Sequence, residues 1–148
     1  MNANTPSPRS ENQLSKIILD AAFKVHTQTG PGLLETVYEV TLAYELQKQG
    51  LRVQRQVPIP IRYDQLNFDE GFRADLLVED KVIVEIKSVE RLVPVHEMQV
   101  LTYLKIADLR LGLLINFNDC SLRDGSRRVS HGAESLSPRP SAPSAAPR

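Results

Sequence analysis

Two strand-like runs joined by a short polar turn lie in the middle of the sequence. Residues 72–78 and 82–89 are rich in Val, Leu and Ile, and the tripeptide Glu-Asp-Lys at 79–81 connects them. Apolar runs of this length around a short polar connection are typical of a β-hairpin. Both runs nevertheless contain charged side chains, at Asp75, Glu85 and Lys87. We therefore expect a sheet in which strands that should be buried carry charge.

Helical periodicity precedes this hairpin. From residue 14 to 25 the apolar side chains recur at i, i+3, i+4, i+7, i+8 and i+11, which predicts a helix. Pro31 and Gly50 enclose a second segment that is expected to be helical, because proline favours the start of a helix and glycine its end.

The remaining segments predict further strands and a third helix. The run 51–63 alternates apolar and polar residues, but Pro58 and Pro60 lack amide donors, so this strand is expected to be interrupted or to lie at an edge of the sheet. Pro94 opens a helix over about 94–108. Its inward-facing residues are expected to be Met98, Leu101, Leu104 and Ala107. Two more strands are expected at 109–117 and 127–130.

This order of elements predicts an α/β (α+β) fold in one domain. Two helices, three antiparallel strands, a helix and one or two final strands would form a mixed central sheet of about four to five strands with flanking helices. The ends, residues 1–10 and 130–148, are rich in Pro and Ser and are expected to be disordered tails around a domain at 11–129.

Composition excludes several classes of protein. The 148 residues are 41% apolar and 24% charged with a net charge of zero, and the arginines are scattered, so no basic groove for strong non-specific duplex binding is expected. Cys120 is the only cysteine, which leaves no internal disulfide and no zinc-binding cysteine pair. The polar start and the absence of roughly 18 consecutive apolar residues predict a soluble cytoplasmic protein without membrane contact.

The register of the hairpin decides whether its charges meet. Glu85 and Lys87 are two residues apart and share one face of a strand. Asp75 joins that face only if paired residue numbers sum to 160, which a three-residue loop produces, whereas a two-residue loop gives 159 and turns Asp75 away. In the first register two carboxylates lie about 5 Å apart, which favours a bound cation. Hard oxygen ligands of this kind suit Mg²⁺ or Mn²⁺.

The same residues resemble known nuclease motifs. Asp75, a nine-residue interval and Glu85-Ile86-Lys87 resemble the D…(D/E)xK core of the PD-(D/E)XK nuclease superfamily, with Ala74 where the name of the motif has proline. Over roughly residues 14–129 the chain is also similar to the GxxExxY protein family. The positions that match its pattern are Gly32, Glu35 and Tyr38. The positions that resemble the QxxxY element of RecB-like nucleases are Gln99 and Tyr103.

These resemblances imply a restriction-endonuclease-like core and a metal-dependent catalytic site. Asp75, Glu85 and the backbone carbonyl of Ile86 would hold Mg²⁺ or Mn²⁺, and Lys87 would be catalytic together with the two carboxylates. Glu35 would be a further catalytic residue, as a ligand of the metal or of a water. The residues expected near the substrate or behind the metal ligands are Gln99, Tyr103 and Tyr38.

Each of these residues also has an ordinary structural interpretation. Glu85 and Lys87 could be a solvated charge pair, and Asp75 a surface residue near a turn. Glu35 could simply favour the positive N-terminus of the second helix, and Tyr38 could be a core residue. A polar rim on the third helix would account for Gln99, Tyr103 and His96, and His96 is expected to be a surface or supporting residue rather than a ligand of Mg²⁺.

Three functions are compatible with the sequence. The first is a metal-dependent nuclease that hydrolyses phosphodiester bonds in DNA or RNA. The second, favoured by the near-neutral charge, is a non-catalytic module that retains the nuclease fold and binds nucleic acid or protein. The third is a structural subunit of a homo-oligomer or of an assembly with a partner protein.

Overall fold

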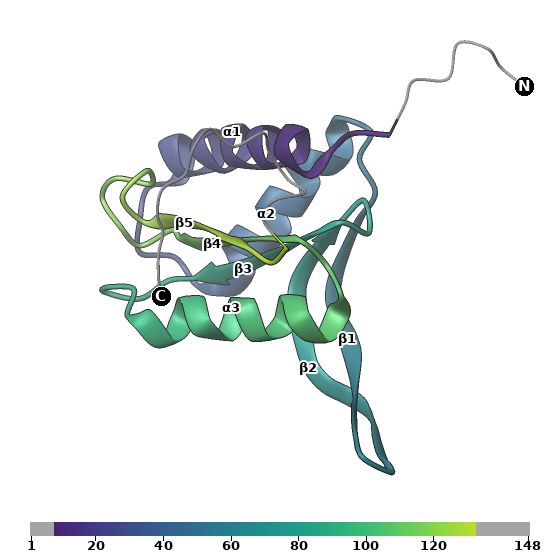
Figure 1. Ribbon diagram of the computed structural model, residues 1–148. Helices are drawn as coiled ribbons and strands as arrows, with labels where there is room; N and C mark the ends of the chain where they lie inside the picture. Colours follow the sequence, from purple (N-terminus) through teal and green to yellow (C-terminus); the bar gives the residue numbers. More distant parts are fainter. Residues whose placement is uncertain (1–7, 133–148) are drawn as a thin grey trace, which may run out of the picture.

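Helices and strands follow one another in the predicted order. The computed structural model describes residues 8–132. Its elements are α1 (Glu11–Thr29), α2 (Glu35–Lys48), β1 (Val53–Tyr63), β2 (Leu66–Val78), β3 (Val82–Lys87), α3 (Pro94–Ala107), β4 (Leu111–Asn116) and β5 (Ser126–Ser130). The strands form one five-stranded sheet in the order β1-β2-β3-β4-β5, with α1 and α2 on one face and α3 on the other (Figure 1). The α+β fold with a mixed sheet and flanking helices is confirmed.

A side-chain cap and a glycine conformation explain where the two N-terminal helices begin. Ser10 caps α1: its Oγ accepts a hydrogen bond from the Gln13 amide at 3.1 Å, and the Gln13 side chain accepts one from the Ser10 amide at 2.8 Å. The predicted start of the second helix at Pro31 is wrong, since α2 begins at Glu35. The reason is Gly32, whose φ of 101° lies in the left-handed region and cannot continue into an α-helix.

Antiparallel and parallel ladders meet in the sheet. β1, β2 and β3 pair antiparallel in succession, β3 and β4 are parallel, and β5 returns antiparallel to β4. α3 forms the crossover that a parallel pair requires. Pro58 and Pro60 lie in β1, which is an edge strand, so the prediction of an edge position is confirmed.

The sheet separates two hydrophobic clusters. The residues of β3 that pack with α1 and α2 are Val82, Val84 and Ile86. Ile83 packs on the opposite face, in the cluster that includes α3. Because alternate side chains of a strand point to opposite faces, Glu85 and Lys87 belong to the face covered by α3.

The buried stripe of α3 is rotated from the predicted one. Val100 and Leu104 are its fully buried residues, and Leu101 and Ala107 are partly buried against them. The prediction that Met98 faces inward is wrong, because its side chain is 63% exposed. Helical spacing alone left two adjacent stripes possible, and the packing of α3 on the sheet selects the one through Val100.

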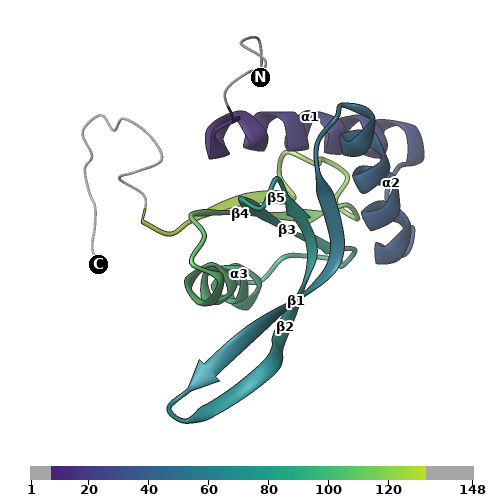
Figure 2. The ribbon, with the colours of Figure 1, turned by 90° about the vertical axis from the view of Figure 1, so that its right-hand side faces the viewer.

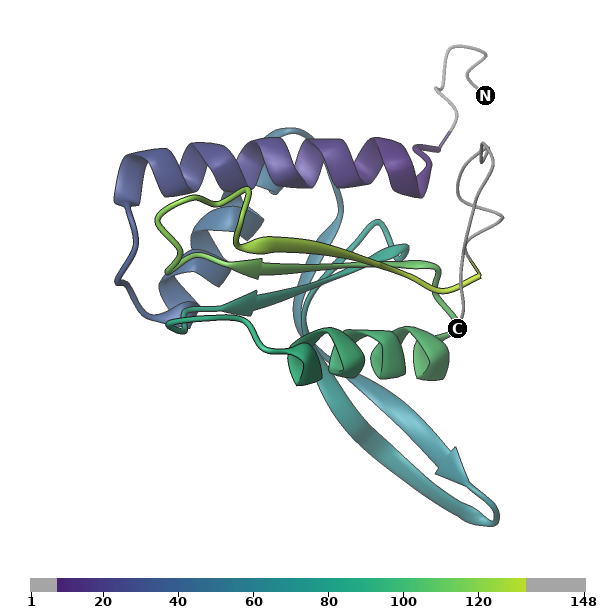
Figure 3. The same ribbon diagram turned by 60° about the vertical axis from the view of Figure 1, so that its left-hand side comes forward.

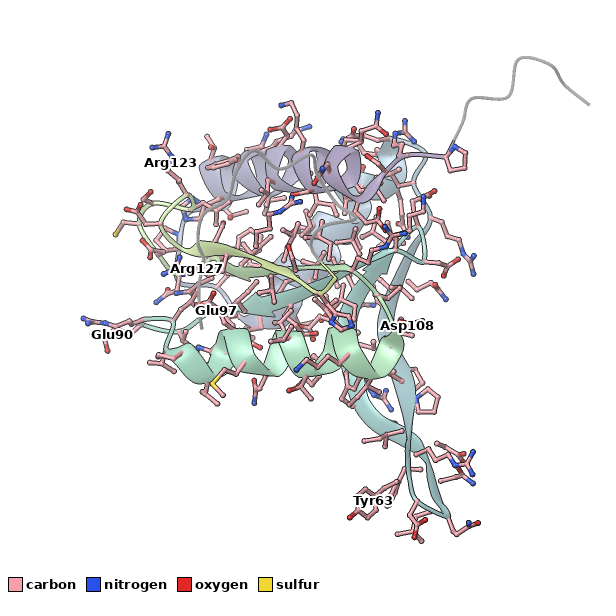
Figure 4. All side chains as sticks on the ribbon, in the orientation of Figure 1. Tyr63, Glu90, Glu97, Asp108, Arg123 and Arg127 are labelled. Atoms are coloured by element: carbon pink, nitrogen blue, oxygen red, sulfur yellow. The ribbon has the colours of Figure 1, made fainter. Side chains whose placement is uncertain are left out.

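The first hairpin is longer than the sequence pattern predicts. β2 begins at Leu66 rather than near Phe72, and residues 59–71 form a hairpin arm that projects from the body of the molecule (Figures 2 and 3). Tyr63 lies near the tip of the arm and is 72% exposed (Figure 4). In the stretch 64–71 only Leu66 and Phe68 are apolar, an alternation too short to predict a strand, which explains the difference.

The predicted tails fall mainly on residues that the structure does not describe, namely 1–7 and 133–148. β5 ends at Ser130, where the C-terminal tail was placed. Within residues 8–132, no helix has the length and apolar character needed to cross a membrane.

Candidate active site

The predicted site lies where the sheet forks. β2 and β3 pair only between residues 76–78 and 82–84. Beyond this pairing β2 runs with β1 into the hairpin arm, whereas β3 continues beside β4 as far as Lys87. Asp75 and Glu85 are the first residues past the last pair, one on each branch. Beyond the last pair, the backbone N–H and C=O groups of β2 and β3 no longer bond to each other. Groups near Asp75 and Glu85 therefore need other hydrogen-bond partners.

β2 also changes face at this point. Leu76 packs in the cluster of α1 and α2, but Ala74 packs in the cluster of α3, although residues two apart on a regular strand share a face. The change falls at Asp75, so its side chain lies between the two layers. Groups from both α2 and α3 can therefore reach it.

The side chains of Asp75 and Glu85 replace the missing ladder bonds. The amide of Asp75 donates a hydrogen bond to Oε2 of Glu85 at 3.1 Å, and the amide of Ile86 donates one to Oδ2 of Asp75 at 2.8 Å. Each carboxylate is thus held by the backbone of the opposite branch. These two hydrogen bonds bring the side chains of Asp75 and Glu85 together.

The register of the hairpin is the one that sums to 160. Leu76 pairs with Val84 and Val78 with Val82, across the loop 79–81. Glu79 and Asp80 adopt left-handed φ values of 53° and 56°, and the Lys81 amide closes the turn on the Val78 carbonyl at 2.9 Å. The predicted three-residue loop is confirmed, and with it the approach of Asp75 to Glu85.

Burial and neighbouring negative charges disfavour the charged forms of both carboxylates. Glu85 is 7% exposed, and burial together with the Asp75 charge raises its pKa to about 8, while the charge of Lys87 acts in the opposite direction. Burial also raises the pKa of Asp75, against the hydrogen bond from the Ile86 amide, and the charges of Glu39 and Glu35 add to the rise. Perturbation of this kind is common where a cation or substrate completes a site.

Lys87 lies beside the carboxylate pair on β3. Its positive charge lowers the pKa of Glu85, yet within residues 8–132 no carboxylate is in salt-bridge range of its Nζ. Its backbone carbonyl accepts a hydrogen bond from the Phe117 amide at 2.9 Å. The backbone of Lys87 is therefore fixed by the sheet, while its side chain, on a half-buried residue, makes no ion pair among residues 8–132.

Glu35 approaches the site from the first turn of α2. Its Oε2 accepts a hydrogen bond from the Ser88 amide at 3.2 Å, and the Ser88 hydroxyl donates one to the Leu33 carbonyl at 2.8 Å. These two bonds attach the start of α2 to the residue that follows Lys87. Glu35 remains exposed, and its charge reaches Asp75.

Tyr38 lies in the core behind this attachment. Its hydroxyl donates to the Gly30 carbonyl at 2.6 Å and accepts from the Leu33 amide at 3.1 Å. The ring stacks on Phe117 with centroids 4.5 Å apart and planes 8° from parallel. Tyr38 thus supports the loop before α2, and through it the position of Glu35, rather than facing the carboxylates itself.

α3 contributes one aromatic side chain to the site. Tyr103 stacks on Phe72 with centroids 3.9 Å apart, and its pKa is raised by burial and then by the charges of Glu85 and Asp75, which places it beside them. Gln99, one turn earlier, is exposed.

His96 belongs to the start of α3 and not to the carboxylate pair. Its Nδ1 accepts a hydrogen bond from the Val93 amide at 3.1 Å, which satisfies one of the unpaired amides at the helix N-terminus. This contact agrees with the expectation that His96 is a surface or supporting residue.

Three polar residues near the site were not predicted from the sequence. Glu39 is only 5% exposed, its carboxylate accepts hydrogen bonds from Arg55 and Gln56, and its charge raises the pKa of Asp75. A sequence signal for Glu39 existed, because it shares a helical face with the buried Leu42 and Leu46 at i+3 and i+7. Arg55 gave a weak signal, since it stands at an apolar position of the alternation between Val53 and Val57, whereas Gln56 falls at a polar position and gave none.

The donor set is compatible with a small divalent cation. Among the residues that the structure describes, no three His, Cys, Asp or Glu side chains lie close enough together to hold a metal ion by themselves. Two interlocked carboxylates with raised pKa values and the neighbouring Ile86 backbone offer hard oxygen ligands. Mg²⁺ and Mn²⁺ suit such an incomplete oxygen set, since they usually keep several water ligands.

Comparison with known families agrees with this geometry. The sequence model of the PD-(D/E)XK nuclease superfamily matches residues 12–129, so the chain belongs to that superfamily. The mixed five-stranded sheet with flanking helices is consistent with its restriction-endonuclease-like fold. No match is found among curated proteins or among solved structures.

Proposed function

We propose that this chain is a metal-dependent nuclease that hydrolyses phosphodiester bonds in nucleic acid with Mg²⁺ or Mn²⁺. Its superfamily supports a nuclease-type function. The observation that carries the proposal is the interlocked pair of Asp75 and Glu85 at the fork of the sheet, with Lys87 beside it.

Each candidate residue has a distinct part in the proposed reaction. Asp75, Glu85 and the Ile86 carbonyl would hold the ion, which when bound lowers the pKa of a water and neutralises phosphate charge. Lys87 would orient the attacking water and stabilise the negative charge that grows on the phosphate oxygens. The water oxygen bonds to phosphorus, the bond from phosphorus to the leaving oxygen breaks, and that oxygen takes a proton. The products are a phosphate monoester and a hydroxyl end.

The surrounding residues would bind and orient. Glu35 would hold a further water or the metal from the start of α2, and Gln99 and Tyr103 would contact the substrate along α3. We also assign the chain to the GxxExxY group within the superfamily, because Gly32 permits the turn before α2 and Tyr38 holds it. A reducing cytoplasmic location is part of the proposal.

A nuclease assay on the full chain tests this function. Single- and double-stranded DNA and RNA would be incubated with Mg²⁺ or Mn²⁺, and cleavage is expected to stop on addition of a chelator. Asp75→Asn should be inactive, whereas Asp64→Asn, in the exposed turn of the hairpin arm, should cleave as the wild type does. Failure to cleave any of the four substrates, or equal cleavage by Asp75→Asn, would contradict the proposal.

A binding module is the second candidate. The zero net charge and the scattered arginines favour it, because they provide little general attraction for a nucleic-acid backbone. Binding of one nucleic acid without cleavage under all metal conditions would select this function.

A further inference from the structure

A second polar network lies behind Asp75. Glu39 of α2 is almost fully buried, and its Oε2 accepts a hydrogen bond from Nε of Arg55 at 3.0 Å and forms an ion pair with Nη2 at 2.9 Å. Its Oε1 accepts one from Nε2 of Gln56 at 2.8 Å. The same Nε2 lies 3.4 Å from Oδ1 of Asp75 and donates to it as well. Gln56 therefore bridges a buried carboxylate of α2 and a candidate metal ligand of β2.

Gln56 also departs from the regular conformation of its strand. Its φ is 53°, in the left-handed region, which costs energy for any residue with a side chain. Arg55 pairs with Leu76 and Val57 with Ala74, but between these pairs Gln56 and Asp75 do not pair. The departure falls at the residue opposite Asp75, where β2 changes face. Local strain of this kind is often found next to functional groups.

The carboxylate of Glu39 decides which end of the Gln56 amide faces the site. An ionised carboxylate can only accept hydrogen bonds, so the nitrogen of the amide must point to it and the oxygen must point away. That nitrogen carries two hydrogens, which allows one bond to Glu39 and one to Asp75. Arg55 compensates the buried charge of Glu39 through its two contacts.

We infer that Gln56 is a positioning residue that orients Asp75 for metal binding, an inference that rests on the proposed function. The Gln56 amide holds Oδ1 of Asp75, and the Ile86 amide holds Oδ2. With both oxygens anchored, the plane of the carboxylate is fixed and its remaining lone pairs point in one direction. Groups that orient a metal ligand typically alter metal affinity or activity by about 10- to 100-fold.

Gln56→Asn is the informative variant. Asparagine tolerates a left-handed φ better than most residues, so the backbone should be retained. Its side chain is one methylene shorter and cannot span Glu39 and Asp75. Binding of Mn²⁺ to the full chain, followed by the electron paramagnetic resonance of free Mn²⁺, is expected to weaken about 10- to 100-fold. The melting temperature of the metal-free protein should fall only slightly, because Glu39 loses one hydrogen bond but keeps its contact with Arg55. The matched control Gln65→Asn, in the turn of the hairpin arm, should bind as the wild type does.

A second variant separates positioning from loss of structure. Gln56→Gly accepts the left-handed backbone without strain and should lose the same Mn²⁺ affinity. Wild-type Mn²⁺ affinity in Gln56→Asn and Gln56→Gly would overturn the inference.

The outcome is distinguishable from that of the nuclease assay. A wild-type protein that binds Mn²⁺ but cleaves nothing ends the proposed nuclease activity and leaves the role of Gln56 to be decided by the affinities alone. A wild-type protein that binds no Mn²⁺ overturns both.

Discussion

β3 and β4 are neighbouring parallel strands, but only β3 carries charged side chains. They pair in register, with Glu85 opposite Leu114 and Lys87 opposite Asn116. All residues of β4 are buried and none is charged, as is usual for a strand covered on both faces. β3 begins in the same way and then places a carboxylate and an ammonium in the same layer of the sheet. The charges of β3 are therefore not required by the fold, since β4 occupies an equivalent place without them.

The polar residues at the ends of the two strands, Asn116 and Lys87, also differ in how their side chains are bonded. Asn116 is fully buried, and its side chain exchanges hydrogen bonds with the amide and the carbonyl of Val89 at 3.0 and 2.9 Å. These bonds fix the segment after β3. Lys87, directly opposite, has no such partner for its ammonium among residues 8–132. A polar group whose bonds are all satisfied by the fold stabilises it, whereas an unsatisfied one is expected to serve a ligand.

The largest expected loss of stability comes from a substitution in β4. Leu114→Ala should lower the free energy of unfolding by about 2–5 kcal/mol, because it removes a fully buried side chain and leaves a cavity. Glu85→Gln, at the paired position, should lower it by less than about 1 kcal/mol. Urea denaturation at neutral pH measures both. Similar losses in the two variants would mean that Glu85 is as structural as Leu114.

The next largest expected effect is on the rate of cleavage and comes from a substitution in β3. Lys87→Ala should reduce cleavage about 10²- to 10³-fold, equivalent to about 3–4 kcal/mol, because the charge it stabilises appears only as the phosphate reacts. The melting temperature should not change, and Lys87→Arg should restore only part of the rate, since the planar guanidinium differs from a compact ammonium. Cleavage by Lys87→Ala at the wild-type rate would mean that catalysis does not explain why β3 carries this lysine and β4 carries no charge.

A bound cation should stabilise the folded protein by neutralising the carboxylates of Asp75 and Glu85. Mn²⁺ at a hundred times its Kd is expected to stabilise the wild type by about 2.7 kcal/mol, which thermal melting detects. Asp75→Asn should gain nothing from the metal, because it lacks one of the two carboxylates that would bind the ion. Equal melting shifts in the two proteins would show that the metal binds elsewhere.

The smallest expected effect is the pH dependence of the metal-free protein. The pKa of Glu85 is about 8 in the folded state against an ordinary value of 4.5. Between these values the folded protein holds a proton that the unfolded chain has released, so stability falls as the pH rises, by about 1.4 kcal/mol for each unit of the pKa difference crossed.

The measurement is denaturation in a chelator between about pH 6 and pH 8. Glu85→Gln removes this contribution, and its stability should fall less over the same range. All other titratable groups are common to both proteins and cancel in the comparison. Parallel curves for the two proteins would mean that Glu85 is ionised throughout.

The sequence by itself determined the features that depend on neighbouring residues. Helical and strand periods gave the order of elements, and the prolines of β1 gave its place at an edge. The sequence also limited the hairpin to two registers, and the structure selected the one with a three-residue loop, which brings Asp75 to Glu85. These features are local, so a single stretch of chain contains all the information that they need.

Only the tertiary structure decided the features that join separate elements. Glu39 on α2 and Gln56 on β1 meet Asp75 on β2 because β1 leaves its regular conformation and β2 changes face where the sheet forks. Periodicity assigns a face to each residue of a regular element, and it has no means to predict where a strand departs from regularity. The position of the fork follows instead from the packing of α2 and α3 on opposite sides of the sheet, and that packing selected which polar side chains surround the carboxylate pair.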